Sequence, residues 1–178
     1  MKRFIVKLAI LCTLVKISST AEAGTETDTA EITQISPEDQ SVSLTSFSYF
    51  STPEKLDIEN IALRQSEFPW QHKDGFTLNS GINYHNIFWY RFSLRNVGSA
   101  AIDRIIFLNT VFVEDLEVVI LQKGTISSHY KGGTYVANRS RPVDHRNFLF
   151  PISLPPNADI EVIIKQSTLI PRFSIQIW

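Results

Sequence analysis

The chain has 178 residues, with 17 Lys and Arg against 18 Asp and Glu, and a formal net charge of −1 at pH 7. A chain of this length is too short for several large domains. A nucleic-acid surface needs an excess of basic residues, and so does electrostatic docking on anionic lipid, so the charge balance argues against both.

Residues 1–23 have the pattern of a secretory signal peptide. Basic residues precede a short apolar run at 8–15, and Ala21 and Ala23 fit the small-x-small rule, so we expect cleavage after Ala23. The run is shorter than the roughly 20 apolar residues that span a bilayer. An uncleaved amphipathic or membrane-anchoring N-terminus is the alternative. The sequence therefore predicts a periplasmic or secreted protein.

Cleavage would change the charge and remove the one cysteine. It takes away four of the 17 basic residues and one of the 18 acidic ones, which leaves a formal net charge of −4. Cys12 goes with the signal, so the mature chain would have no disulfide and no thiolate chemistry. No second segment is apolar enough to cross a membrane. A domain of this size must then rely on its core, which buries about 68–70% of the unfolded surface.

The first mature segments differ in composition. Residues 24–41 are polar and acidic with no aromatic residue, and we expect a flexible leader there. The β-domain is then expected over residues 42–178. Residues 42–50 predict its first strand. A short helical turn is expected in 51–63, after Pro53, because Pro suits a helix start.

The rest of the chain predicts strand after strand, separated by Gly, Asn and Pro turn signals. The predicted strands are 76–78, 87–96, 102–108, 113–122, 125–130, 148–154, 159–166 and 172–178. This spacing is typical of an all-β fold, and about eight antiparallel strands predict a jelly-roll-like β-sandwich. Residues 134–147 form a long polar loop, and we expect 148–154 to pair with 159–166 across Pro155, Pro156 and Asn157.

The strand FWYRFSLRN (88–96) has two distinct faces, because side chains alternate along a strand. Phe88, Tyr90, Phe92 and Leu94 form a core face, and Trp89, Arg91, Ser93 and Arg95 share the other. Trp89 and Arg91 are either a ligand platform or a structural cation–π pair, which is worth about 0.5–2 kcal/mol. We favour the structural interpretation.

Motifs for catalysis or metal binding are not found. The sequence has no G-x-S-x-G, H-E-x-x-H or phosphate-cradling glycine loop. His72, His85, His129 and His145 have no metal-ligand spacing. Asp144 and His145 are adjacent and would point to opposite sides of a strand. We therefore predict no enzyme, no metal and no cofactor.

The long loop gathers aromatic and basic residues. The candidate ligand-binding residues are Tyr135, Arg139, Arg141, His145 and Arg146. Carbohydrate sites combine an apolar or aromatic wall with a few polar groups, and arginine adds a planar fork for carboxylate or phosphate. The alternative is a solvated loop face, although long loops on a sandwich often carry binding.

Several stretches together resemble a known family. They are SYFSTPEKLDIENIAL, FPWQHKDGFTLNSG, FWYRFSLRN, LEVVIL, GGTYVANRSRPVDHRNFLFPISLP and DIEVIIKQST. In this order they are similar to the type-2 extracellular domain of bacterial seven-transmembrane receptors with diverse intracellular signalling modules. The resemblance covers about residues 42–178. It implies a periplasmic jelly-roll-like sensor for a carbohydrate or related small ligand.

The resemblance also sets limits. Trp89, Arg91, Arg141 and Arg146 match polar and aromatic positions that recur in this family. The resemblance does not say whether they bind ligand or hold the sandwich together. The family usually continues into membrane helices, and this sequence stops at Trp178. We expect a non-enzymatic sensor or ligand-binding module. The alternatives are an interaction or scaffold domain that contacts an envelope or membrane receptor protein, and a truncated receptor fragment.

Overall fold

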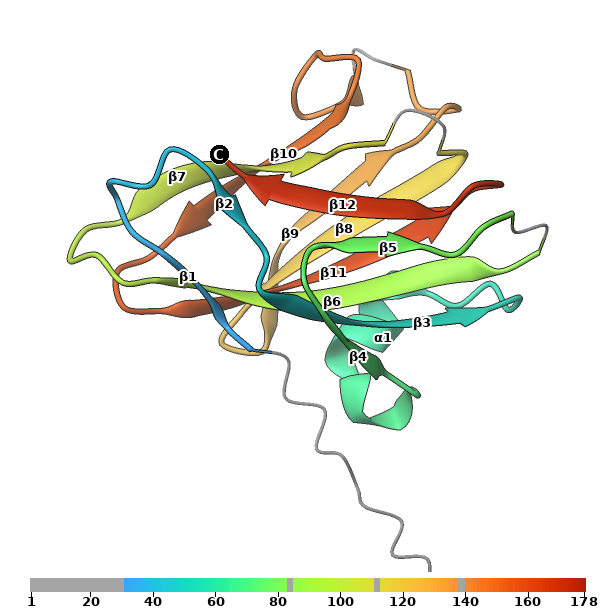
Figure 1. The fold of residues 1–178 in the computed structure, drawn as a ribbon, viewed down its shortest axis with the longest axis horizontal. Coiled ribbons are helices and arrows are strands. Elements are labelled where there is room, and N and C mark those ends of the chain that lie inside the picture. Colours follow the sequence, from blue (N-terminus) through green and yellow to red (C-terminus); the bar gives the residue numbers. More distant parts are fainter. Residues whose placement is uncertain (1–30, 83–84, 111–112, 138–139) are drawn as a thin grey trace, which may run out of the picture.

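The computed structural model describes residues 31–82, 85–110, 113–137 and 140–178. Two β-sheets pack face to face, as the ribbon in Figure 1 shows. All pairings are antiparallel except that of β1 with β6. The prediction of an all-β, jelly-roll-like sandwich is confirmed. The predicted signal peptide, with its cleavage after Ala23, lies outside the described residues.

The larger sheet has seven strands, and its longest strand pairings lie at its centre. In spatial order they are β4 (Gln71–Asp74), β3 (Ser46–Thr52), β6 (Ile87–Asn96), β11 (Asp159–Ser167), β8 (Asp115–Gln122) and β9 (Thr125–Gly132), with β1 (Thr33–Ile35) beside the end of β6. β11 lies between β6 and β8 and is apolar on both faces, with Ile163 and Ile164 both buried. A strand buried on both faces reads as a continuous apolar run.

The smaller sheet has five strands. They are β10 (Phe148–Leu154), β7 (Ile102–Leu108), β12 (Arg172–Ile177) and β2 (Val42–Ser43) in spatial order, with β5 (Thr77–Asn79) also paired to β12. β12 thus has β7 on one edge, and β2 and β5 on the other. The residues that pair with β7 are 175–177, and those that pair with β5 are 172–174.

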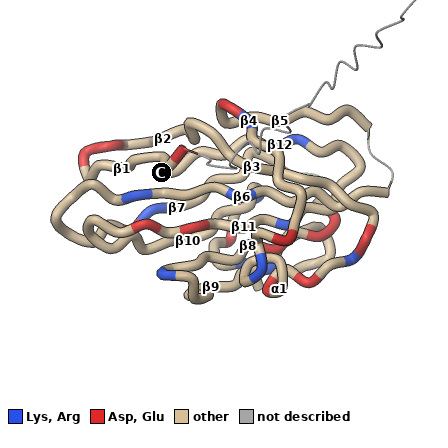
Figure 2. The backbone as a smooth tube through the Cα atoms, turned by 90° about the horizontal axis from the view of Figure 1, so that it is seen from below, with Lys and Arg blue, Asp and Glu red and all other residues tan. Residues whose placement is uncertain are grey.

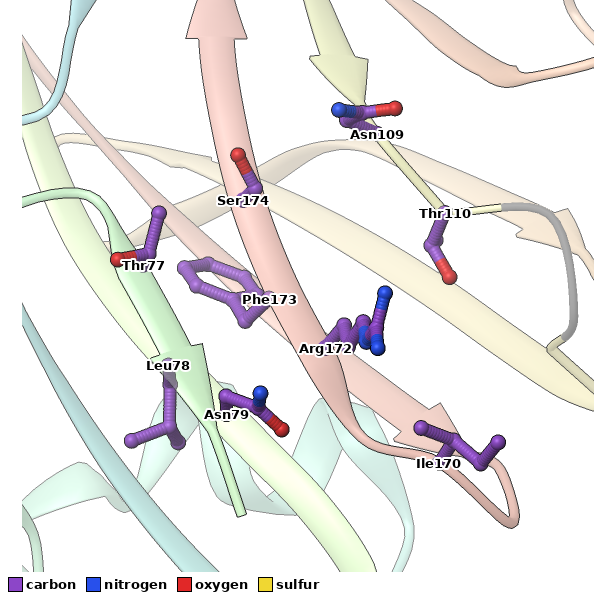
Figure 3. A pocket seen from close by; sticks show the side chains of 9 residues that line it. All are labelled: Thr77, Leu78, Asn79, Asn109, Thr110, Ile170, Arg172, Phe173 and Ser174. Atoms are coloured by element: carbon purple, nitrogen blue, oxygen red, sulfur yellow. The ribbon is translucent and has the colours of Figure 1, made fainter. Parts of the chain in front are cut away.

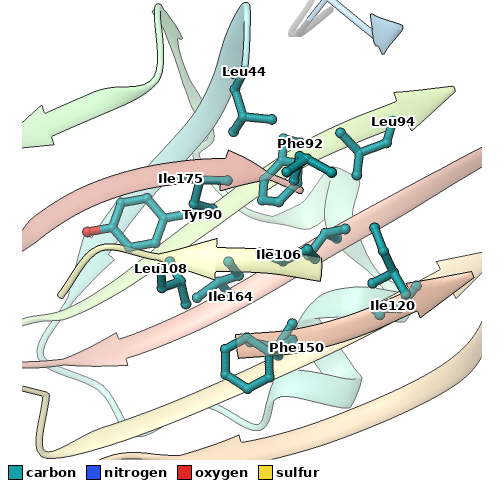
Figure 4. Close-up of a cluster of buried hydrophobic side chains, with 14 of the residues drawn as sticks. Leu44, Tyr90, Phe92, Leu94, Ile106, Leu108, Ile120, Phe150, Ile164 and Ile175 are labelled. Carbon is teal, nitrogen blue, oxygen red and sulfur yellow. The ribbon is translucent and has the colours of Figure 1, made fainter. Parts of the chain in front are cut away.

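The main core fills the space between the sheets (Figure 4). It takes alternate residues of the long strands, such as Phe92 and Leu94 of β6 and Ile175 of β12. The rings of Tyr90 and Phe173 stack across the core with centroids 3.8 Å apart. The period-2 alternation of the sequence therefore correctly predicts the inner face of FWYRFSLRN.

A second apolar cluster lies on the outer face of the larger sheet. The helix α1 (Ile58–Leu63) and the 3₁₀ helix η1 (Gln65–Glu67) follow β3, and α1 contacts β8, β9 and β11. Ile58 and Ile61 of α1 are buried there, together with Trp89. At Trp89, the face of FWYRFSLRN expected to point outward is therefore covered by the helix, whereas the Arg95 side chain on the same face is 44% exposed.

The predicted pairing of 148–154 with 159–166 is wrong. β10 pairs with β7 in the smaller sheet, whereas β11 pairs with β6 and β8 in the larger one. Asn157 does form a turn, with φ of 51°, but this turn carries the chain from one sheet to the other. Both strands bury one apolar face in the shared core, so alternation alone does not tell a hairpin from a crossing between sheets.

Two N-terminal expectations also differ from the structure. Within the predicted leader, β1 pairs with β6 and buries Ile35 in the main core, so that prediction is wrong for these residues. The helix begins later than the Pro53 signal suggested. Its N-cap is Asp57, whose Oδ1 accepts a hydrogen bond from the backbone N–H of Asn60 at 3.0 Å. Asp is a strong N-cap residue and sets the start here.

Candidate functional site

Trp89 is a core residue of the covered face. Its exposed fraction is 0%, and it stacks on Phe50 with ring centroids 5.9 Å apart. Phe50 also meets Trp70 edge to face at 4.8 Å. The Trp89 indole Nε1 has no hydrogen-bond partner among the described residues. In this arrangement the indole is closed off from solvent and contributes packing.

Arg91 lies on the same face, next to the first residue of η1. Its guanidinium lies 4.7 Å above the ring of Trp70, not that of Trp89, and Nη1 donates to Gln65 Oε1 at 2.9 Å. The Arg91 side chain is 14% exposed, with Glu161 at 3.9 Å. Burial lowers the pKa of Arg91, and the charge of Glu161 partly offsets that effect. This geometry fits a clasp between η1 and the sheet.

The predicted loop residues are held in different ways. Arg141 stacks over Phe148 at 4.7 Å and donates to the carbonyl oxygens of Gly133 and His145, both at 3.3 Å. Tyr135 is 85% exposed, and Arg146 is exposed as well. Arg139 lies outside the described residues.

Further contacts fix the start and end of this loop. The imidazole Nδ1 of His145 accepts from the backbone N–H of Asn147 at 3.0 Å. Gly133 has φ of 110°, and a Cβ there would lie 2.4 Å from the carbonyl oxygen of Glu114, so only glycine fits. The loop therefore leaves β9 in a fixed direction. Neither cavity described below is lined by it.

A charged network lies beside α1 on the larger sheet. Lys165 Nζ is 2.6 Å from Glu117 Oε1 and 3.0 Å from Asp115 Oδ2. His129 bridges Glu117 at 2.9 Å and Glu59 of α1 at 3.3 Å. Figure 2 shows acidic and basic residues close together near β8, β9 and α1.

The network shifts two pKa values. Burial would raise the pKa of Glu117, but hydrogen bonds from Lys165 and His129 outweigh it, and the pKa lies below its usual value. Burial would lower the pKa of Lys165, but its hydrogen bonds to Glu117 and Asp115 raise it overall. Both groups are thus charged at neutral pH, and their ion pair links β11 to β8 beneath α1.

A cavity of about 780 Å³ opens on the smaller sheet, where β7 ends beside β12 (Figure 3). We call it the β12 cavity. Its described lining is Thr77, Leu78, Asn79, Asn109, Thr110, Ile170, Arg172, Phe173 and Ser174. Three of these side chains are apolar, five carry a hydroxyl or amide, and one is cationic.

The β12 cavity follows from how the strands end. The backbone N–H of Asn109 still donates to Ser174 O at 3.0 Å, but the N–H of Thr110 bonds back to Leu108 O at 2.9 Å and turns the chain away. β12 therefore loses its β7 neighbour next to residues 172–174, while β5 stays paired on the opposite edge. Phe173 lines the cavity and also packs in the main core.

Sequence reasoning missed this cavity. The alternation of RFSIQIW places Arg172, Ser174 and Gln176 on one strand face, which was the available signal. It does not show which of them meets an open space, because that depends on where β7 leaves β12. A second groove, of about 460 Å³, lies between β9 and β10, where the Tyr130 hydroxyl donates to Pro151 O at 2.9 Å.

A comparison with protein families matches residues 45–178 to the family described as 7TMR-DISM extracellular 2. The chain belongs to this family. The match spans β3 to β12 and so contains the β12 cavity, the long loop and the Arg91 clasp. The family assignment predicted from the sequence motifs is confirmed.

The 7TMR-DISM extracellular 2 domains are extracellular sensor domains of receptors. A search of the curated proteins found no match. None of the described helices has the length and apolar character needed to cross a bilayer. Within the described ranges, no group of three or more His, Cys, Asp and Glu side chains is arranged to hold a metal ion.

Proposed function

We propose that the chain is a non-enzymatic periplasmic sensor module that binds a small carbohydrate-like molecule in the β12 cavity. The observation that carries this proposal is the composition of the cavity. Leu78, Ile170 and Phe173 supply apolar surface, and the amides of Asn79 and Asn109 supply hydrogen bonds. Sugar rings have an apolar C–H face and a polar rim, which such a lining matches.

The size and the side-chain types support binding rather than catalysis. A volume of about 780 Å³ lies in the range of small-molecule pockets, roughly 300–1,000 Å³. The described lining has no carboxylate, imidazole, amine or thiol, so it offers none of the usual general acids and bases. The family of extracellular sensor domains supports a role outside the cytoplasm. In this proposal residues 1–23 direct the export.

The long loop is a rival ligand site. Tyr135, His145 and Arg146 are exposed in it, and Arg141 is fixed against Phe148. The strong exposure of Tyr135 also favours the alternative of a surface that contacts an envelope or membrane receptor protein, since exposed aromatic residues are common in interfaces.

Ligand screening of the full chain tests the proposal. Thermal shift at millimolar sugar, followed by calorimetry, should find stabilisation by at least one monosaccharide or sugar acid. Asn79→Ala and Asn109→Ala should each weaken binding about tenfold, the effect of about 1.4 kcal/mol from lost hydrogen bonds. Arg146→Ala, in the loop, should leave the affinity unchanged.

Two results would contradict the proposal. If no sugar or sugar acid stabilises the chain, the ligand class is wrong. If Arg146→Ala abolishes binding while Asn79→Ala and Asn109→Ala retain it, the ligand lies in the long loop instead.

A further inference from the structure

Arg172 is the one charged side chain in the described lining of the β12 cavity. It is exposed and pairs in register with Asn79 of β5. In Figure 3 its guanidinium extends toward Thr110, on the opposite side of β12 from Thr77 and Leu78. No hydrogen bond, ion pair or ring contact engages it among the described residues.

The other described arginines show how unusual this is. Arg95 is paired with Asp159 at 2.6 Å, and Arg64 with Glu67 at 2.7 Å. Arg104 donates to three carbonyl oxygens of the segment that precedes β2. Arg91 and Arg141 have the partners described above. Only Arg146 is similarly without a partner, and it lines neither of the two described cavities.

The chemistry of the guanidinium limits what Arg172 can bind. Arginine carries five N–H donors in a planar fork and no acceptor. A carboxylate satisfies that fork with two parallel hydrogen bonds, because it is planar, charged and an acceptor only. A sugar hydroxyl is a weaker partner, since it is neutral and also donates. The amides and hydroxyls nearby both donate and accept, so they suit the ring hydroxyls of the same ligand.

We infer that the ligand of the β12 cavity is an acidic saccharide of the hexuronate type, with its carboxylate on Arg172. This inference rests on the proposed function, because it names the ligand class of the same site. The described lining contains no Asp or Glu that would repel an anion or occupy the guanidinium. Arg172 is then the residue that selects acidic over neutral sugars.

Matched sugar pairs test the inference on the full chain. Calorimetry compares glucuronate with glucose and galacturonate with galactose, at low and at high salt. At least one uronate should bind ten times or more tightly than its neutral parent, and salt should reduce the difference because it screens exposed charges. Arg172→Gln should abolish the preference, and Arg172→Lys should keep only part of it, because lysine lacks the fork.

Arg64→Gln is the control, since it removes an exposed arginine that pairs with Glu67 and lines neither described cavity, and it should leave the preference intact. Thermal unfolding of each variant checks that the exposed substitution does not disturb the fold. Equal affinity for acidic and neutral sugars, or a preference that survives Arg172→Gln, overturns the inference and leaves the proposed function standing. If neither member of any pair binds, the proposed function fails and the inference falls with it.

Discussion

The outer faces of the two sheets differ in what lies over them. On the larger sheet, α1 and η1 cover a second apolar cluster in which Trp89 is fully buried. On the smaller sheet, Arg172, Ser174 and Gln176 share one face of β12 with Trp178, and all four are exposed or half-buried. The first face is built like a core, and the second is open to solvent.

The same residue types therefore have different roles on the two faces. Trp89 packs beneath α1, whereas Trp178 is 44% exposed and stacks on Phe107 at 4.4 Å. Arg91 has an aromatic ring, an amide and a carboxylate around it, whereas Arg172 has no partner among the described residues. The difference teaches that an aromatic or basic residue on an outer strand face becomes a site candidate only where nothing covers it.

The largest expected effect separates the two tryptophans. Trp89→Ala should lower the free energy of unfolding by about 3–5 kcal/mol, because it removes a fully buried aromatic side chain and leaves a cavity. Trp178→Ala should cost only about 1 kcal/mol, the value of one aromatic pair on the surface. Urea denaturation measures both. Similar costs for the two variants would show that α1 does not hold Trp89 in a core.

The charged network under α1 should give the next largest effect. Glu117→Gln should destabilise the fold by about 2 kcal/mol at pH 7, because it leaves the partly buried Lys165 without its closest carboxylate. Asp74→Asn is the control, since this carboxylate is exposed on β4, and its effect should be within about 0.5 kcal/mol.

The pKa shifts fix the sign of the pH dependence. The folded pKa of Glu117 lies below its ordinary value of 4.5, so its contribution is present above that pH and is lost as the pH falls through the folded pKa. The folded pKa of Lys165 lies above 10.5, so its contribution is present below that pH and is lost as the pH rises through the folded pKa. The stability gap between wild type and Glu117→Gln should shrink below pH 4.5. A gap that widens there would contradict the assignment.

Arg91 and Arg95 provide a smaller contrast along one strand. Arg91→Lys should cost about 1–2 kcal/mol, because lysine cannot stack flat on Trp70 while donating to Gln65. Arg95→Lys should leave stability nearly unchanged, since Arg95 and Asp159 form an exposed pair that solvent screens. Calorimetric unfolding compares the two variants. An equal loss of stability in both would show that Arg91 does not hold η1 against the sheet.

The smallest expected effect concerns the start of α1. Asp57→Ala should cost about 1 kcal/mol through loss of the N-cap, whereas Asp57→Asn should be nearly neutral. Hydrogen exchange of the amides of 58–63 should speed up in the alanine variant alone. Unchanged exchange would mean that packing, not the cap, decides where this helix begins.

Much of the sandwich could be predicted because its long strands alternate cleanly. The ranges of β6, β10 and β12 follow from apolar residues at every second position. β4 could not be predicted, since all four of its residues are exposed and polar, and β1 is too short to show a period. The sequence also does not show which strands pair with each other, because the strands of both sheets bury an apolar face in the same core.

The candidate site was predictable only in its chemistry. The sequence indicated a module with aromatic and basic residues on its strands and loops, but the cover over Trp89 and the opening beside Arg172 depend on contacts between segments far apart in the chain. α1 reaches β8 and β11, which lie 50 to 100 residues later. The ligand role of Tyr135, Arg139, Arg141, His145 and Arg146 stays a prediction.

The strand order also sets how the chain folds. β8 and β9 are joined by Lys123 and Gly124 alone, with φ of 52° and 73°, which is the two-residue turn that suits a hairpin. Such a hairpin forms in about 1–10 μs. β11 must instead find β6, whose Arg95 is 64 residues from Asp159, and pairings this distant slow folding to milliseconds or longer. β12 has partners that are more distant still, since Ile175 pairs with Leu108, 175 − 108 = 67 residues earlier, and Gln176 pairs with Ser43, 176 − 43 = 133 residues earlier. In the newly made chain, the apolar residues Phe173, Ile175 and Ile177 therefore stay unpaired longest, which makes this segment the one most exposed to aggregation and the natural target for a chaperone.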